Sequence, residues 1–118
     1  MSLREGLGEL LGRVQAGEGL LVMDRDGLPV EALPGESGAS PEAIGAECVP
    51  LLREAEALAQ GLNLGAWTHF GLMTVHKNIH FVPLGQDCTL ALLTRATGNA
   101  ATGRRAVREG AQALRALL

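Results

Sequence analysis

The pattern of apolar and polar positions between residues 65 and 95 predicts three consecutive β-strands, against which the rest of the chain should pack. The predicted strands cover residues 67–76, 79–84 and 88–94. Lys77-Asn78 and Gly85-Gln86-Asp87 supply the turn residues between them. Connections this short force neighbouring strands to run antiparallel. The sequence therefore predicts an antiparallel meander.

The distribution of apolar side chains assigns these strands to places in a sheet. The strand over 88–94 is apolar on both faces, with Leu90 and Leu92 on one side and Ala91 and Leu93 on the other. Such a strand is typical of the centre of a sheet that is covered above and below.

The strand over 67–76 is more mixed, which makes it a candidate edge strand. One face carries Trp67, His69, Met73 and Val75, and the other carries Thr68, Phe70, Leu72 and Thr74. It has no Pro, and its one Lys lies at the turn, so it lacks the devices that normally keep edges apart. We therefore expect this edge to be covered or paired with another chain.

The first part of the chain predicts a helix and then a β-hairpin. Apolar residues recur at helical spacing over about the first fifteen residues, at Leu3, Leu7, Leu10, Leu11 and Val14. Gly17 should end this helix. Strands over 20–23 and 28–33 then flank the turn 24–27, because its Asp-Gly pair is a strong hairpin signal. Pro29 favours an edge position for the returning strand.

A long second helix is predicted from Pro41 to about Gly61, after a loop over 34–39. Ser40 can accept hydrogen bonds from the first amides, and proline fits the first helical position. Pro50 leaves one carbonyl without its usual partner, so we expect a bend there. Apolar residues form a stripe and its flanks: Ile44, Cys48, Leu51, Ala55, Leu58 and Leu62, widened by Val49, Leu52 and Ala59. An arc this broad can cover the sheet on one side and meet a second helix on the other.

A third helix should carry the chain to its end after Thr97-Gly98-Asn99 breaks the last strand. Its buried stripe is predicted at Val107, Ala111, Leu114 and Leu118. The element order is then helix, two strands, helix, three strands, helix, which is that of an α+β fold. A chain of 118 residues is long enough for a single domain, residues 1–118, with its own core.

Composition argues against several function classes. No apolar run approaches the roughly 20 residues needed to span a bilayer. The N-terminus also lacks the apolar segment of a signal peptide. We therefore expect a cytoplasmic protein without membrane insertion. Cys48 and Cys88 lie among apolar residues, which favours their use as small hydrophobic side chains.

The formal charge of -3 at pH 7 is unevenly distributed. Apart from Asp87 and Glu109, every acid lies at or before Glu56, whereas the second half is basic. This asymmetry favours association between unlike surfaces. It does not indicate nucleic-acid binding, because the chain is acidic as a whole and has only one Trp and two Phe.

Two segments resemble catalytic motifs, and each has a simpler interpretation. Residues 20–27 resemble the nucleophile motif of haloacid-dehalogenase-type phosphatases, but the downstream half lacks the acidic pair needed for Mg²⁺, so a hairpin turn is favoured. Residues 98–105 resemble a phosphate-binding loop, but Arg104-Arg105 stand where Lys and then Ser or Thr are required. A helix start is the favoured interpretation there.

Three histidines could be read as a metal cluster. His76 and His80 flank the predicted turn and could approach each other across the hairpin, with His69 on the preceding strand. No carboxylate or Cys near them in sequence completes a ligand set, so surface or edge-strand histidines are favoured. We expect neither a metal nor another cofactor.

The order of elements and several local patterns resemble the Roadblock/dynein light chain family, including its bacterial MglB-like members. The resemblance covers nearly the whole chain. It rests on GLLVMDRDG (19–27) after a leucine-rich helix, ALAQGL (57–62) at the end of the long helix, and VPLG (82–85) with LALL (90–93) before the last helix.

This resemblance implies a five-stranded antiparallel sheet with helices on both faces, a Roadblock/profilin-like sandwich. It also implies that two subunits join through the third strand into one continuous sheet. Members of the family are similar to one another in serving as non-catalytic platforms that bind or regulate Ras-like small GTPases, so the resemblance implies no catalytic residues.

We therefore hypothesise a homodimeric regulator of a small GTPase. The expected interface comprises Trp67, His69, Phe70, Leu72 and Met73 of the third strand with Cys48, Leu51, Leu52 and Ala55 of the second helix. The expected GTPase contacts are Arg53, Glu54 and Glu56. Two alternatives of other classes are a small-ligand sensor, in which sheet and helix enclose a pocket, and a truncated phosphatase that uses Asp24.

Overall fold

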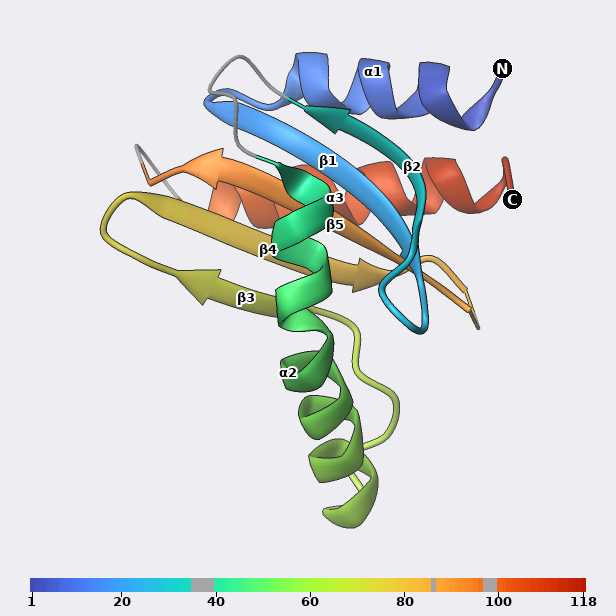
Figure 1. Ribbon diagram of the computed structural model, residues 1–118, viewed down its shortest axis with the longest axis vertical. Coiled ribbons are helices and arrows are strands. Elements are labelled where there is room, and N and C mark those ends of the chain that lie inside the picture. The colour runs from blue at the N-terminus through green and yellow to red at the C-terminus, as the bar shows by residue number, and fades with distance from the viewer. Residues whose placement is uncertain (35–39, 86, 97–99) are drawn as a thin grey trace.

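The computed structural model describes residues 1–34, 40–85, 87–96 and 100–118, in which five strands form one sheet between two layers of helix (Figure 1). The elements are α1 (Leu3–Arg13), β1 (Gly17–Asp24), β2 (Pro29–Pro34), α2 (Pro41–Gly61), β3 (Phe70–Met73), β4 (Lys77–Pro83), β5 (Cys88–Arg95) and α3 (Ala100–Arg115). The strand order is β2-β1-β5-β4-β3, and every neighbouring pair is antiparallel. The predicted fold class and element order are confirmed.

Strand β1 shows why the sheet has a core on each face, since successive side chains of a strand point to opposite sides. Leu20 and Val22 pack with apolar residues of α1 and α3, whereas Leu21 and Met23 pack with those of α2. Helices α1 and α3 therefore cover one face of the sheet, and α2 crosses the other (Figure 1).

The predicted places of three strands are confirmed. Strand β5 lies in the middle of the sheet, with Leu90 and Leu92 in the core beneath α1 and α3 and Ala91 in the core beneath α2. Strand β2 begins with Pro29 and forms one edge, and β3 forms the other.

Side chains at the helix starts define where α1 and α2 begin. The Ser40 hydroxyl accepts a hydrogen bond from the Ala43 amide at 3.2 Å, and Pro41 is the first residue of α2, as predicted. The Ser2 hydroxyl likewise accepts from the Glu5 amide at 3.1 Å, and the Glu5 carboxylate accepts from the Ser2 amide at 3.3 Å. This reciprocal pair is a capping box. Helix α2 continues without interruption past Pro50.

The hairpin between β1 and β2 is confirmed and is held by one carboxylate. The Asp24 side chain accepts hydrogen bonds from the amides of Asp26 (2.9 Å) and Leu28 (3.0 Å). Gly27 has a φ of +85°, a conformation that glycine adopts without steric cost. Asp24 is therefore a turn-forming residue.

The hairpin between β3 and β4 differs from the prediction. Strand β3 is shorter than expected, and Lys77 and Asn78 belong to β4 instead of the turn. The Thr74 amide donates to the Lys77 carbonyl oxygen at 3.1 Å and to the Asn78 side-chain oxygen at 3.3 Å, while the Lys77 amide donates to the Thr74 hydroxyl at 3.1 Å. These local side-chain bonds close the turn earlier along the chain than residue type alone suggests.

Helix α3 ends at Arg115, before the predicted end of the helix. Val107, Ala111 and Leu114 are buried as predicted, but Leu118 is exposed because it lies beyond the last helical turn. The predicted strand break at 97–99, most of the loop at 34–39 and the glutamine of the predicted turn at 85–87 lie outside the described residues. None of the described helices is both long and apolar enough to cross a membrane.

Candidate functional site

Strand β3 leaves one side of the sheet open. It pairs with β4 on one side and with no other described strand. Leu72 lies opposite Ile79, which packs against the α2-side core, so Leu72 is on the α2 side of the sheet and is 40% exposed. An apolar edge strand of this kind can pair with a strand from another chain.

The C-terminal half of α2 extends beyond this edge and carries exposed leucines (Figure 1). Leu58 and Leu62 are 61% and 59% exposed, and Leu51, seven residues before Leu58, is also exposed. Spacings of seven and four residues place the three side chains on one flank of the helix. We call Leu51, Leu58, Leu62 and Leu72 the edge surface.

The face of α2 that packs against the sheet is not centred on the predicted apolar stripe. Cys48 and Leu52, expected at a helix–helix contact, pack into the core of the same chain with Val49. The reason is Gly45, where a Cβ atom would lie 2.3 Å from Cδ2 of Leu21. Because this position has no side chain, the helix approaches β1 along that line and turns Leu51 outward. Ala55 is half-buried at the border between core and edge surface.

The residues around β3 are divided between the two faces of the sheet. Phe70 packs against Phe81 in the α2-side core, with ring centroids 6.2 Å apart. Trp67 packs against the same core, although alternation predicted opposite faces for Trp67 and Phe70. Trp67 precedes the first residue of β3, so the two-residue period does not extend to it. Met73 is exposed at the end of the strand.

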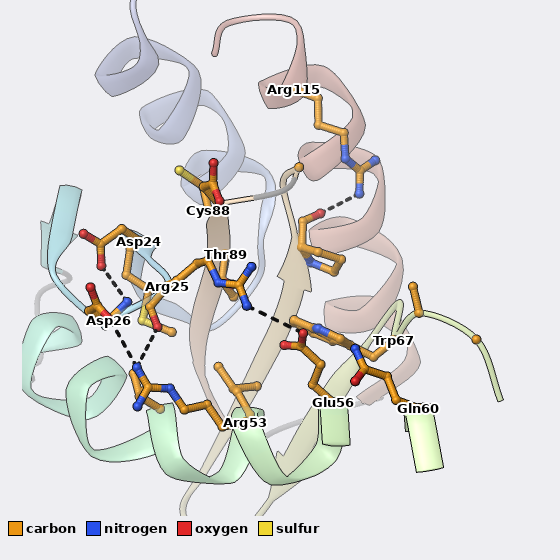
Figure 2. A pocket seen from close by; sticks show the side chains of 18 residues that line it. Asp24, Arg25, Asp26, Arg53, Glu56, Gln60, Trp67, Cys88, Thr89 and Arg115 are labelled. Atoms are coloured by element: carbon orange, nitrogen blue, oxygen red, sulfur yellow. Dashed lines mark hydrogen bonds and ion pairs between the residues drawn. The ribbon is translucent and has the colours of Figure 1, made fainter. Parts of the chain in front are cut away.

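Three charged residues of α2 that were expected to contact a GTPase do not form a single cluster. The Arg53 guanidinium lies 3.1 Å from an Asp26 carboxylate oxygen, and a Glu56 oxygen lies 3.8 Å from Arg25 (Figure 2). Both pairs join α2 to the β1–β2 turn. Glu54 is exposed on another side of the helix, with no partner among the described residues.

An open pocket of about 520 Å³ lies between the β1–β2 turn, α2, and the ends of β4 and β5 (Figure 2). Arg25, Arg53, Glu56 and Trp67 line it. Cys88 also contributes to the wall, and burial raises the pKa of its thiol, with Asp87 and Asp24 raising it further. A thiol with a raised pKa is mostly protonated, so Cys88 is not an activated nucleophile.

The structure brings His69 and His80 together, whereas the sequence suggested His76 and His80. His80 is buried in the sheet, in contrast to the surface or edge position expected for it. Burial, then the neighbouring His69, then Arg104 lower the pKa of His80 to about 4. No group of three or more His, Cys, Asp or Glu side chains suited to a metal ion occurs among the described residues. Both cysteines are free thiols.

The groups that a phosphatase would need are not assembled. Asp24 lies at the end of β1 and bonds the amides of its own turn. A phosphatase of this type would also need a lysine to hold the phosphoryl group, and Lys77, the lysine of this chain, forms an ion pair with Glu18 near the start of β1. Six residues of strand separate Glu18 from Asp24 by roughly 20 Å. The two groups therefore do not form one site.

Sequence reasoning missed three features of this region. The burial of His80 was missed because His80 looks polar in a strand pattern. The close approach at Gly45 was missed because a glycine within a helical pattern does not show which strand the helix packs against. The outward turn of Leu58 and Leu62 follows from that approach. The one available signal was Gly45 itself, which lies in line with Leu52 on one helix face.

No protein-family model and no curated protein matches the chain, but solved structures match its fold. A structure of MglB with a tetrameric arrangement is 16% identical, with a TM-score of 0.83 and coverage of 99% of this chain and 90% of that one. The gliding protein MglB from Thermus thermophilus is 15% identical, with a TM-score of 0.82 and coverage of 99% and 91%. A Roadblock/LC7 domain from Streptomyces avermitilis is 16% identical, with a TM-score of 0.83 and coverage of 98% and 97%. This chain therefore has the Roadblock-like fold of MglB-type proteins.

Proposed function

We propose that this chain is a non-catalytic, homodimeric regulator that binds a Ras-like small GTPase. The observation that carries the proposal is the edge surface, in which an unpaired strand edge and exposed leucines of a projecting helix occur at the same border of the sheet. Large exposed apolar surfaces of this kind mark sites of association.

The self-association step follows from the open strand and the helix together. A second copy would pair its β3 with this β3 across a two-fold axis and extend the sheet, which uses the free backbone groups of the edge. Leu51, Leu58 and Leu62 would then meet a second α2. Compared with the set expected from sequence, Leu58 and Leu62 take the place of Cys48 and Leu52 in this proposal. One MglB structure of the same fold has a tetrameric arrangement, which supports self-association here.

The GTPase step is supported by the likeness in fold to MglB and by the sequence resemblance to Roadblock proteins. The proposed contacts are the ion-paired residues Arg53 and Glu56 next to the β1–β2 turn, together with Glu54 on another side of the same helix. A surface of mixed charge favours specific orientation of a partner more than raw affinity. The chain is proposed to act in the cytoplasm, by altering the nucleotide cycle or the position of the GTPase.

Two measurements test this function. Light scattering of the purified chain should give twice the mass of one chain at micromolar concentration. Immobilised chain should then retain a small GTPase from extract of its host with a preference for either the GTP-loaded or the GDP-loaded form. A monomer that retains neither form would overturn the proposal.

A second candidate function is a small-ligand sensor, favoured by the open pocket of about 520 Å³. Its volume falls within the range of roughly 300 to 1,000 Å³ that is usual for small-ligand sites. Its wall is mixed, with Trp67 as the aromatic residue and Arg25, Arg53 and Glu56 as charged groups. Three results together would favour this candidate over the first. The chain would be a monomer, a cellular small-molecule fraction would stabilise it against heat, and the Trp67→Ala variant would not be stabilised by that fraction.

A further inference from the structure

The basic residues of the chain fall into two groups according to their partners. Five of the ten form ion pairs with acids: Arg4, Arg13, Arg25, Arg53 and Lys77. The other five form no ion pair with a described acid; one is Arg95 at the end of β5, and four lie on α3: Arg104, Arg105, Arg108 and Arg115. Most of the positive charge without a described acidic partner is therefore on one helix.

These four arginines line one hollow, which we call the α3 groove. Its volume is about 580 Å³, and it runs between α3, Val82 of β4 and Thr68 before β3. Glu109 is the one acid among the described residues of its wall, and Gln112 and Thr68 add neutral hydrogen-bonding groups. The α3 groove lies along α3, on the face of the sheet opposite α2, so it is separate from the edge surface. It meets the pocket of Figure 2 at Arg115, which lines both.

The spacing of the arginines indicates the shape of the ligand. Arg104, Arg108 and Arg115 are four and then seven residues apart, so they follow one line along the helix. That line is about 16 Å long at the rise of an α-helix. A compact anion would reach only one or two of the guanidinium groups. An extended or helical chain with repeated carboxylates would reach all three.

We propose that the α3 groove binds an acidic polypeptide segment of a partner protein, whose carboxylates pair with Arg104, Arg108 and Arg115. Complementary charge is the argument for this occupant, since planar guanidinium groups bind carboxylates through two parallel hydrogen bonds. Arg115 already donates to the Pro83 carbonyl at 2.7 Å, which holds its guanidinium near the end of β4. The proposal does not depend on GTPase binding.

A neighbouring group reports on occupation of the groove. Burial and then Arg104 and Arg108 lower the pKa of His69, so the charge of these arginines reaches the sheet. A bound carboxylate would offset part of that positive charge. The pKa of His69 should therefore rise when an acidic segment binds.

The test uses the full chain and a fluorescein-labelled peptide of twelve residues in which Glu alternates with Ala. Its counterpart carries Gln in place of every Glu. Fluorescence anisotropy at low salt should show binding of the Glu peptide, weaker binding as salt is added, and none of the Gln peptide. The double variant R104Q/R108Q should bind the Glu peptide about fivefold more weakly, because the loss of each exposed ion pair lowers the affinity a few-fold.

A matched double variant controls for net charge. R13Q/R95Q removes two exposed arginines outside the α3 groove and should bind as tightly as the parent chain. NMR titration of the His69 ring should show its pKa rising with the Glu peptide in the parent chain and not in R104Q/R108Q.

Five results would overturn the proposal, four of them in the peptide experiment. These are no binding of the Glu peptide, equal binding of the Gln peptide, equal loss in both double variants, and displacement of the peptide by inorganic phosphate at matched ionic strength. A fifth is tighter binding to phosphatidylglycerol vesicles than to the peptide, which would make a membrane surface the occupant. If the chain binds the Glu peptide but does not bind a GTPase, the result would count only against the proposed GTPase function.

Discussion

The Nε2 atom of His69 lies 3.2 Å from the Nδ1 atom of His80, across the pairing of β3 with β4. His80 is 1% exposed, and its other ring nitrogen has no hydrogen-bond partner among the described residues, as is also true of Nδ1 of His69. One of the two facing nitrogens must donate and the other accept, so the contact requires at least one neutral ring. It ties the open edge of the sheet to the α3 side of the core.

This contact predicts that the chain loses stability in mild acid. The folded-state pKa of His80 is about 4, whereas the ordinary value is 6.5, so the unfolded chain binds the proton more readily. The contribution of neutral His80 is complete above pH 6.5 and is lost as the pH falls towards 4. The free energy of unfolding should drop by roughly 3 kcal/mol over this range from His80 alone. Urea unfolding at a series of pH values measures it.

Two variants distinguish the contribution of His80 to this pH dependence from that of the rest of the chain. His80→Gln should flatten the pH dependence between 6.5 and 4, even if it is less stable at pH 7. His76→Gln changes an exposed histidine in the neighbouring turn and should keep the dependence of the parent chain. A curve for His80→Gln as steep as that of the parent would contradict the assignment.

Gly27 predicts a second effect, on the hairpin that packs beneath α2. Its φ is +85°, and a Cβ atom there would lie 2.6 Å from Cγ2 of Val49. Gly27→Ala therefore combines a strained backbone with overpacking, and should lower the free energy of unfolding by about 2 to 4 kcal/mol. Thermal and urea unfolding measure this.

Gly8 is the matched control for that substitution. A Cβ atom at Gly8 meets nothing within 4 Å, and the residue lies within α1. Gly8→Ala should stabilise the chain by about 0.5 to 1 kcal/mol, because alanine favours a helix more than glycine does. Equal effects of the two variants would show that the approach of the hairpin to α2 is not as close as described.

The edge surface predicts a variant that separates association from folding. Leu58 is 61% exposed, so Leu58→Glu should change the free energy of unfolding of one chain by no more than about 0.5 kcal/mol. In the proposed dimer it would place two carboxylates between two α2 helices, and it should weaken the dimer at least tenfold. Sedimentation equilibrium measures the dissociation constant.

Leu28 provides the control for this variant. It is 62% exposed next to the β1–β2 turn, away from the open edge of β3. Leu28→Glu should leave the dimer intact. If Leu28→Glu and Leu58→Glu weaken association equally, the effect comes from net charge and the edge surface is not the interface.

The amino-acid pattern predicts most of the sheet, because alternation and turn residues determine strands locally. Leu90 to Leu93 indicated a central strand covered on both faces, and β5 has that place. The turn after β3 could not be placed, because side-chain hydrogen bonds of Thr74 and Asn78 competed with the residue types expected at a turn.

The candidate site was less predictable than the fold, because it depends on which face of α2 meets the sheet. The sequence predicts a buried stripe through Ile44, Cys48 and Leu51. Ile44 and Cys48 do pack against the α2-side core, but Leu51 is exposed and Val49 and Leu52 are buried instead. The close approach at Gly45 turns the helix towards that side. The pairing of His69 with His80 depends likewise on the register of β3 against β4, in which Gly71 faces His80.

Glu54 offers the sharpest test of where a GTPase would bind. Its side chain is exposed and has no partner among the described residues, so Glu54→Arg should leave the fold of one chain unchanged. If the GTPase contacts this part of α2, the reversed charge should lower its affinity about tenfold through repulsion at the interface. Glu9→Arg makes the same change of charge on α1 and should bind the GTPase as the parent does. The Glu9 side chain has one described partner, Arg13 at 3.9 Å. The measurement compares how much GTPase the two immobilised variants retain. If both variants retain it equally, the GTPase does not contact this part of α2. If only Glu54→Arg retains less, the GTPase binds beside the dimer interface.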